Sequence, residues 1–445
     1  MYYFSKFYVG NPPSEQSAII DTGSDTLAFP CDHCRSKDCG THQDPRFFSA
    51  RSRTFQFKIH CPYKIFYHNH KVCKFVKSYA EGSSLLGFLA EDYIRFKNSR
   101  RVNDAKLNSL NKLLRNDLKL KTEFGCTTKE TGLFKTQYAD GILGLDDEST
   151  MISSIEQMNS RQVAKVMSFG LCFHNTGGIM SIDLRKKNVP DDKIVMLNKS
   201  VNEYENPLIV KYDASSGYYE ITVSHFSIVK DSQTHAEMRG LDPINMMIDS
   251  GTTFSHFPDE YSNAIFAKLN EYCRADSTRC GRIPNALFRE DSCLELRKPD
   301  ENYANEKELL ASFPEIRIHF GNNKRAYILH PGNYFYKEYD DDHNENVIRL
   351  CMAIKGHEEN KIILGAFAMI DNYFYFDRKS QHLKIFKENC YLRTVQLLMK
   401  RERVLSEEVF KGKKGTAILL YMSVIGLSGL GLFIASKFRR KKKEN

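Results

Sequence analysis

A six-residue pattern occurs twice in this chain of 445 residues, and its repetition predicts a molecule built from two similar halves. The first copy spans residues 19–24 and reads IIDTGS, and the second spans residues 247–252 and reads MIDSGT. In each copy an apolar strand breaks into a tight glycine turn directly after an aspartate. An Ile-Leu-Gly segment follows far downstream of each copy, at residues 142–144 and 363–365. We therefore expect two similar lobes of about 190 residues each.

The two aspartates of the repeat, Asp21 and Asp249, are candidate catalytic residues. Two carboxylates that meet across a pseudo-dyad cannot both ionise without a large free-energy cost, so they share one proton and titrate as a coupled pair. The ionised carboxylate can act as general base on a water molecule, while the protonated one donates to a substrate carbonyl. This chemistry needs no metal, no cofactor and no covalent intermediate. The neighbouring residues would support the pair through close backbone approach and hydroxyl hydrogen bonds: Thr22, Gly23, Ser24, Ser250, Gly251 and Thr252.

The chain carries twelve cysteines, an even number that suggests disulfide bonds and an oxidising compartment. Five lie close together, at Cys31, Cys34, Cys39, Cys61 and Cys73, and seven follow, at Cys126, Cys172, Cys273, Cys280, Cys293, Cys351 and Cys390. The first three with His42 could also be written as a zinc site, but the spacing fits no common zinc finger and the compartment favours disulfides. Connectivity cannot be deduced from the spacing.

Residues 415–436 carry no charge and would form about 33 Å of helix, enough to span a bilayer rather than serve as a buried core helix. Basic residues follow at once within residues 437–445, and the positive-inside rule places this tail in the cytosol. Lys442 and Lys443 stand fourth and third from the end, which resembles the dilysine retrieval signal of endoplasmic-reticulum membrane proteins, recognised by a coat complex. A plain stop-transfer cluster is the alternative. We expect a single-pass type I membrane protein of the endoplasmic reticulum, or otherwise of an endosomal or cell-surface membrane.

The net charge of +9 gives little support to nucleic-acid binding, because residues 437–445 alone contribute six basic groups and one acid. Hydrophobic residues make up 41% and charged residues 27%, which excludes a collagen, a long coiled coil or wholesale disorder. We expect no nucleic-acid partner.

The aspartate motifs and Ile-Leu-Gly segments resemble the pepsin-like aspartic proteases. Residues 373–377, which read YFYFD, and residues 384–386 resemble that family's closing strands. The resemblance covers most of residues 2–390 and implies an all-β, bilobal fold. The expected parts are an N-terminal lobe at 1–190, a C-terminal lobe at 191–390, a charged stalk with some helical character at 391–414, the transmembrane helix at 415–436 and a basic cytosolic tail at 437–445.

The same resemblance places Asp21 and Asp249 on the family's catalytic pair and Tyr79 on the tyrosine of a mobile hairpin flap that closes over substrate. Glu81 and Gly82 follow at the expected flap tip. A carboxylate at that place should favour a basic substrate side chain a few residues before the cut. The alternative is that Glu81 is an exposed turn acid.

Within the family, the closest likeness is to the plasmepsin V branch, membrane-anchored proteases of the endoplasmic reticulum. It rests on Phe29-Pro30-Cys31, the cysteine-rich insert up to Cys73, Glu81 and the C-terminal anchor; the membrane-anchored beta-secretase type is a looser match. The plant nepenthesin type has a similar insert, and resemblance to it implies three features of the disulfide pattern: Cys126 bonded back into the insert, Cys172 with Cys390, and Cys293 with Cys351. Cys273 with Cys280 would then be a local pair.

Three features depart from the family's pattern. Ala28 stands where a tryptophan is usual, so the common tryptophan–tyrosine hydrogen bond to the flap cannot form. Asp25 stands where a serine is common, and it is either a third carboxylate that raises the pKa values of the pair or a solvated turn residue. Residues 95–121 form a basic insert whose leucine spacing allows an amphipathic helix, with a surface loop as the alternative.

These features together predict a membrane-anchored aspartic endopeptidase that processes polypeptides of the secretory pathway. A catalytically inactive peptide-binding relative is one alternative, although both aspartates, both neighbouring hydroxyls and the flap tyrosine are present. A sheddase of an endosomal or surface membrane is another.

Overall fold

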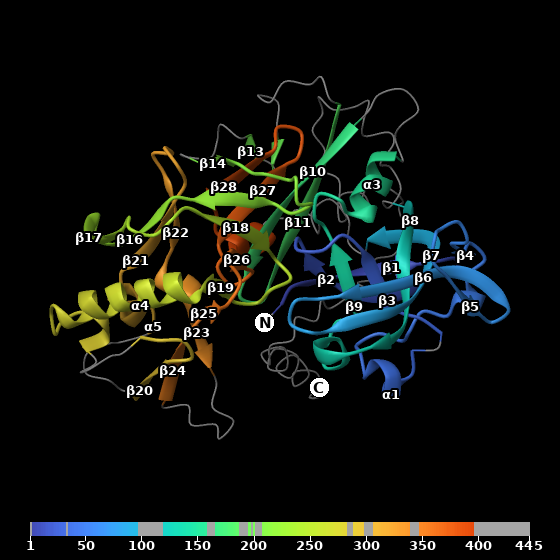
Figure 1. Cartoon of the computed structure of the whole chain (residues 1–445), viewed down its shortest axis with the longest axis horizontal. Coiled ribbons are helices and arrows are strands. Elements are labelled where there is room, and N and C mark those ends of the chain that lie inside the picture. The colour runs from blue at the N-terminus through green and yellow to red at the C-terminus, as the bar shows by residue number, and fades with distance from the viewer. Residues whose placement is uncertain are drawn as a thin grey trace, which may run out of the picture.

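The computed structural model describes residues 2–32, 34–96, 119–157, 165–186, 195–196, 199–200, 207–282, 288–297, 306–338 and 347–395. Strands dominate within these residues, and the helices are few and mostly short. The expectation of a mostly-β fold is confirmed. Figure 1 shows the first strands of the chain on one side of the molecule, most of the later strands on the other, and a third group between them.

A nine-stranded sheet, here called the N-terminal sheet, contains the first aspartate. Its strands are β1 (Phe4–Val9), β2 (Ser14–Asp21), β3 (Leu27–Pro30), β4 (Gln56–Phe57), β5 (Lys64–Tyr67), β6 (His70–Ser78), β7 (Ser84–Phe96), β8 (Lys119–Glu130) and β9 (Gly141–Gly144). They run in the order β1-β2-β9-β3-β8-β7-β6-β5, with β4 beside β7. The helices on this side are α1 (Ser36–Cys39), η1 (Ser49–Arg51), η2 (Gly132–Lys135) and α3 (Thr150–Gln157).

The second aspartate lies in a five-stranded sheet of order β15-β18-β26-β19-β25. Its strands are β15 (Glu220–Val223), β18 (Ile244–Asp249), β19 (Ser255–Pro258), β25 (Ile354–His357) and β26 (Ile362–Gly365). Two smaller, separate sheets come from the same part of the chain. One contains β16 (His225–Lys230), β17 (Gln233–Met238), β21 (Glu315–His319) and β22 (Ala326–Leu329), and the other contains β20 (Cys293–Arg297), β23 (Phe335–Glu338) and β24 (Val347–Met352). The helices here are α4 (Asp259–Arg274), η5 (Cys280–Arg282), α5 (Glu306–Ala311) and α6 (Pro331–Tyr334).

A third sheet combines strands from distant parts of the chain, and Figure 1 shows it between the other two groups. Its strands are β10 (Lys165–His174), β11 (Gly177–Lys186), β14 (Leu208–Lys211), β27 (Asn372–Asp377) and β28 (His382–Lys387), in the order β11-β10-β27-β28-β14. A two-stranded pair, β12 (Val195–Met196) with β13 (Lys199–Ser200), stands apart. The disulfide between Cys172 and Cys390 adds a covalent link to the shared sheet. The division into lobes at residues 190 and 191 stays a prediction, since strands from both sides of that boundary share this sheet.

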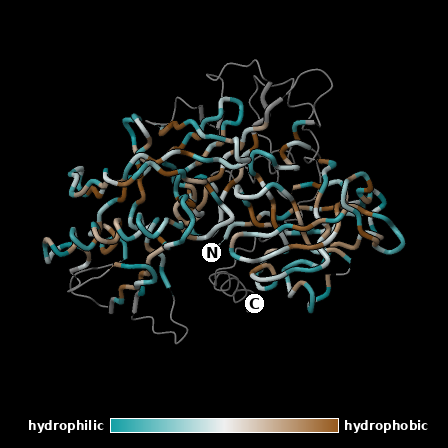
Figure 2. The backbone as a smooth tube through the Cα atoms, viewed as in Figure 1, coloured by the Kyte–Doolittle hydropathy of each residue, from teal (hydrophilic) through white to brown (hydrophobic). Residues whose placement is uncertain are grey.

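The strands that carry the aspartates are buried almost throughout. The last six residues of β2 are buried, as are five of the six residues of β18 and all six of β27. Continuous burial is typical of strands covered on both faces, and it accounts for their apolar sequences. Figure 2 shows hydrophobic stretches along the strands and hydrophilic residues gathered at the outer turns.

All twelve cysteines are paired. The disulfides join Cys31 with Cys126, Cys34 with Cys39, Cys61 with Cys73, Cys172 with Cys390, Cys273 with Cys280, and Cys293 with Cys351. Cys126 is bonded back into the cysteine-rich insert, and the three later pairs are those that the resemblance implies. The two remaining bonds, within 34–39 and 61–73, are local links that the sequence left open.

Several expectations fall partly or wholly outside the described residues. The basic insert is strand at both ends, where β7 extends to Phe96 and β8 starts at Lys119, and its middle is not described. Residues 390–395 are helical, and the expected stalk at 391–414 lies mostly outside the described residues. Among the residues that the structure describes, no helix has the length and apolar character needed to cross a bilayer. The expected membrane helix at 415–436 and the tail at 437–445 lie outside them.

Candidate active site

The two aspartates occupy equivalent positions at the ends of two equivalent strands. β2 runs parallel to β9 with Asp21 opposite Gly144, and β18 runs parallel to β26 with Asp249 opposite Gly365. A Cβ atom on Gly144 would stand 2.4 Å from the backbone nitrogen of Thr26, and one on Gly365 would stand 2.3 Å from a backbone oxygen. The glycine of each Ile-Leu-Gly segment is therefore required by the close passage of the loop after each aspartate. These loops are called the first aspartate loop, residues 21–26, and the second aspartate loop, residues 249–254.

Each aspartate side chain is held by its own loop in the same way. Asp21 Oδ1 accepts a hydrogen bond from the Gly23 N–H at 2.8 Å, and Asp21 Oδ2 accepts one from the Ser24 hydroxyl. Asp249 Oδ1 accepts from the Gly251 N–H at 2.8 Å, and its Oδ2 accepts from the Thr252 hydroxyl at 2.6 Å. The carboxyl groups are thus oriented by backbone and hydroxyl donors, as the sequence predicted for Ser24 and Thr252.

Thr22 and Ser250 bind the two loops to each other. The Thr22 hydroxyl donates to the Ile248 carbonyl at 2.7 Å, and its oxygen accepts the Ser250 N–H at 3.0 Å. The Ser250 hydroxyl donates to the Ile20 carbonyl at 2.8 Å, and its oxygen accepts the Thr22 N–H at 3.1 Å. Both side chains are fully buried. This reciprocal set of four hydrogen bonds holds the aspartate-bearing strands in a single register.

The two carboxyl groups lie against each other's loops. A Cβ atom on Gly23 would stand 2.7 Å from Asp249 Cγ, and one on Gly251 would stand 2.3 Å from Asp21 Oδ1. A hydrogen bond joins the two carboxyl groups, and each side chain is nearly buried. Burial raises the pKa of Asp21 well above its ordinary value, the Asp249 carboxylate raises it further, and donation from Ser24 works in the opposite direction. The geometry therefore brings the predicted pair together, in a form that can retain one proton.

The predicted flap is the hairpin of β6 and β7, with its tip at residues 79–83. The Tyr79 N–H donates to the Ser83 carbonyl at 2.9 Å, and Gly82 adopts φ of 88°, which favours glycine. Glu81 is exposed at the tip. Burial raises the pKa of Tyr79, and the nearby Asp21 and Asp25 carboxylates raise it further, so its hydroxyl remains protonated beside the pair.

The side chains around Tyr79 replace the contact that a tryptophan usually makes. Ala28 is fully buried in a cluster with Phe134, against which Tyr79 packs at a ring-centroid distance of 4.9 Å. The Ser24 side chain lies near the Tyr79 hydroxyl and acts to lower the pKa of Tyr79. Asp25 is paired with Lys77 of β6 at 2.6 Å, so it is not a free turn residue.

Asp146, directly after β9, was not singled out from the sequence. Its N–H donates to the Ser24 carbonyl at 3.0 Å, and its buried carboxylate accepts the Glu148 N–H at 3.0 Å. Burial, and then the Asp25 carboxylate, raise the pKa of Asp146 to about 7. This carboxyl group titrates near neutrality beside the first aspartate loop.

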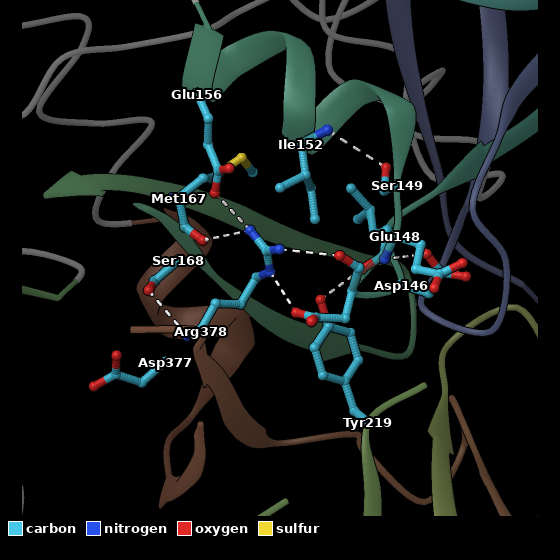
Figure 3. A network of polar contacts seen from close by, with 12 residues as sticks. Asp146, Glu148, Ser149, Ile152, Glu156, Met167, Ser168, Tyr219, Asp377 and Arg378 are labelled. Carbon is cyan, nitrogen blue, oxygen red and sulfur yellow. Dashed lines mark hydrogen bonds and ion pairs between the residues drawn. The ribbon is translucent and has the colours of Figure 1, made fainter. Parts of the chain in front are cut away.

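The segment around Asp146 is anchored to the shared sheet by Arg378, as Figure 3 shows. Arg378 Nε donates to Asp147 Oδ1 at 2.7 Å and Nη1 donates to Glu156 Oε1 at 2.6 Å, while Nη2 donates to the Asp147 carbonyl at 3.0 Å. Arg378 lies just after β27, far from both carboxylates in sequence, so no local pattern could have identified it.

Two groups of side chains in the described part come close enough to hold a cation, but each contains both sulfurs of a disulfide: Cys34, Cys39 and Glu130, and Cys293, Glu338 and Cys351. Disulfide sulfurs are not thiolates and do not supply the ligands that zinc requires. His42 instead pairs with buried Glu130 at 2.8 Å. The zinc alternative is therefore wrong for Cys31, Cys34, Cys39 and His42.

A mostly-β fold that brings two equivalent aspartate loops together is the architecture of the aspartic-protease class. The chain belongs to the pepsin-like aspartic protease family. The family description "Xylanase inhibitor N-terminal" matches residues 3–182, and "Xylanase inhibitor C-terminal" matches residues 218–387.

Among known proteins, the chain is 24% identical to plasmepsin V of Plasmodium falciparum (isolate 3D7) over 496 aligned positions, which cover 98% of this chain and 78% of that protein. It is 21% identical to aspartic protease 5 of Toxoplasma gondii, over 87% of this chain and 36% of that protein. A probable aspartic protease of Arabidopsis thaliana is 24% identical over 87% of this chain and 80% of its own length. The likeness to plasmepsin V stated from the sequence is confirmed.

Proposed function

We propose that this protein is an aspartic endopeptidase in which Asp21 and Asp249 hydrolyse peptide bonds through an activated water molecule. The observation that carries the proposal is the paired geometry: two buried carboxyl groups joined by a hydrogen bond, each oriented by a glycine N–H and a hydroxyl.

The reaction follows from the shared proton. The ionised member of the pair takes a proton from water, and the oxygen of that water attacks the peptide carbonyl carbon. The protonated member donates to the carbonyl oxygen and so stabilises the charge that develops there. The tetrahedral intermediate collapses when the C–N bond breaks: the departing nitrogen takes up the proton that the pair accepted from water, and the proton given to the carbonyl oxygen returns to the pair as the C=O bond re-forms. The donors around the pair supply a fixed electrostatic environment that need not reorganise during these steps.

The substrate is a polypeptide in extended conformation, covered by the flap. The exposed Glu81 carboxylate at the flap tip favours an Arg or Lys side chain near the cut. Profiling a peptide library with the wild type, Glu81→Gln and Glu81→Ala tests this preference. Both variants should lose the enrichment of basic residues at one position, and an unchanged profile would refute the role of Glu81.

The protein is held in the membrane by residues 415–436, with its body on the lumenal side, where it processes proteins of the secretory pathway. The uncharged segment and the basic tail support this placement. Lys442 and Lys443 return it to the endoplasmic reticulum. Replacing both lysines with alanine should move the protein forward along the secretory pathway, whereas a surface or endosomal sheddase would change little.

A second candidate is a peptide-binding protein without catalysis, because the matched family descriptions are named for an inhibitor. Incubating a peptide pool with the full chain and with Asp249→Asn separates the two. Hydrolysis by the wild type alone supports the protease. Binding without new termini in either protein supports the inactive relative, and equal cleavage by both would show that the proposed mechanism is wrong.

A further inference from the structure

The flap is joined to the first aspartate loop by charge as well as by the contacts of Tyr79. This chain contains no tryptophan, and the position from which an indole could reach the flap is the small, fully buried Ala28. The aromatic packing that remains under the flap comes from Phe134. The ion pair between Lys77 and Asp25 adds a second, polar contact between the flap and the first aspartate loop.

Side chains alternate along the flap strand, so two side chains that are neighbours on its inner face lie over two consecutive residues of the first aspartate loop. Successive side chains of a strand point to opposite sides, so Lys77 and Tyr79 share one side, while the intervening Ser78 is exposed. Lys77 Nζ lies 2.6 Å from Asp25 Oδ2, and the Tyr79 side chain lies near Ser24. The flap strand thus contacts the loop at two neighbouring points.

Asp25 is itself held in place to receive Lys77. Its second oxygen, Oδ1, accepts the Thr26 hydroxyl at 2.6 Å, and its backbone carbonyl accepts the Thr150 N–H at 3.0 Å. Asp146 lies close enough for the Asp25 carboxylate and the Lys77 ammonium to act on its titration in opposite directions. Lys77 therefore meets a carboxylate of fixed orientation, next to a second acidic group.

We propose that the ion pair between Lys77 and Asp25 is a tether that positions the flap over the aspartate pair. The inference rests on the proposed function, since the flap position matters to catalysis only if the pair hydrolyses peptides. Lys77 and Asp25 are positioning residues and touch no reacting atom. Without the tether the free protein spends more time with the flap raised. The apparent affinity for substrate then falls in proportion to the fraction of molecules in which the flap is closed.

The kinetic test compares Lys77→Met with Lys74→Met, an exposed lysine on the same strand. Lys77→Met should raise KM roughly five- to tenfold and leave kcat within about twofold, because bound substrate lowers the flap again. Asp25→Asn should have the same effect, and the double variant should be no worse than either single variant. Lys77→Arg should restore KM. Equal KM values for Lys77→Met and Lys74→Met, or a fall confined to kcat, would overturn the tether.

A second measurement needs no catalysis. Hydrogen exchange of the flap-tip amides of Tyr79 and Gly82 should accelerate in full-length Lys77→Met and Asp25→Asn, and not in Lys74→Met. Faster exchange in a protein that cleaves nothing would keep the tether and reject the proposed function. Normal cleavage with unchanged exchange would support the proposed function and reject the tether. The pair is about one-third exposed on each side, so these variants are expected to fold.

Discussion

The two aspartate loops share one backbone design and differ in the side chains placed around it. Asp21 and Asp249 have matching donors, and each faces a glycine in a parallel neighbour strand. Four residues after the aspartate, however, the first loop has Asp25 and the second has Thr253. Two residues after the facing glycine, the first repeat has Asp146 and the second has Phe367, which packs near Phe254 and Tyr336.

This difference distinguishes two roles of the loop residues: orienting the aspartate, and fixing the loop to its surroundings. The shared donors orient a carboxylate, and they are needed twice. The carboxylates around the first loop connect that loop to the flap and to Arg378, whereas the aromatic residues around the second fill space against the sheet. The first half therefore carries the contacts to the flap and to Arg378, and the second half has aromatic packing at the matching positions. Each of the following changes tests that division.

The largest effect is expected from the feature that the halves share. Asp21→Asn and Asp249→Asn should each lower kcat/KM about 10³-fold or more, since either change removes the shared proton chemistry. Neither should lower the free energy of unfolding near neutral pH, because each removes one of two buried carboxyl groups that repel when ionised. Peptide cleavage and urea unfolding of both variants measure this. Loss of activity in only one of them would contradict the equivalence of the loops.

The next effect should come from the contact that anchors the first half to the shared sheet. Arg378→Met leaves the Asp147 and Glu156 carboxylates without their cationic partner and should cost about 3 kcal/mol of unfolding free energy. The matched contact in the second half is the Tyr327 hydroxyl, which donates to the Ala368 carbonyl at 2.5 Å. Tyr327→Phe should cost about 1 kcal/mol. Equal costs in urea unfolding would show that the two halves are anchored alike.

One part of the pH dependence of stability should come from Asp146, in the first half. The pKa of Asp146 is raised from 3.8 to about 7 in the folded protein, so the folded state holds this proton more tightly than the unfolded state does. Its contribution to stability is complete below pH about 4 and is lost as the pH rises through about 7. Asp146→Asn should therefore remove roughly 2–3 kcal/mol of the decline in stability between pH 5 and pH 8. Phe367→Leu, at the matching position, should leave the pH dependence unchanged, and an unaltered slope in Asp146→Asn would contradict the assignment.

The sequence predicted those parts of the site that short, local segments specify. The aspartates, their glycines and hydroxyls, the Ile-Leu-Gly strands and the flap tyrosine all lie within short segments whose residue types serve one local geometry. Lys77 could have been found by the same means, because it stands two residues before Tyr79 and so lies on the same side of the strand.

The contacts across the molecule could not be found in that way. Arg378 meets Asp147 and Glu156 only because β27 packs beside β10 in the shared sheet, and nothing near Arg378 in sequence specifies these partners. Likewise, the pairing of twelve cysteines depends on which strands become neighbours. Spacing alone left that choice open, and only the family resemblance narrowed it.

The smallest effect should again be equal in the two halves, at the hydrogen bonds that join the loops. Thr22→Val and Ser250→Ala each remove one hydroxyl and leave a buried carbonyl and a buried N–H without a partner, so each should cost about 1–2 kcal/mol of unfolding free energy. Thr222→Val, which removes an exposed hydroxyl from β15, is the control and should change stability by less than about 0.5 kcal/mol. Because Thr22 and Ser250 use four separate hydrogen bonds, neither hydroxyl can replace the other. If only Thr22→Val lowers the free energy of unfolding, the hydrogen bonds made by the first loop contribute more to the junction than those made by the second. The two loops would then differ in this contact as they do in the side chains around them.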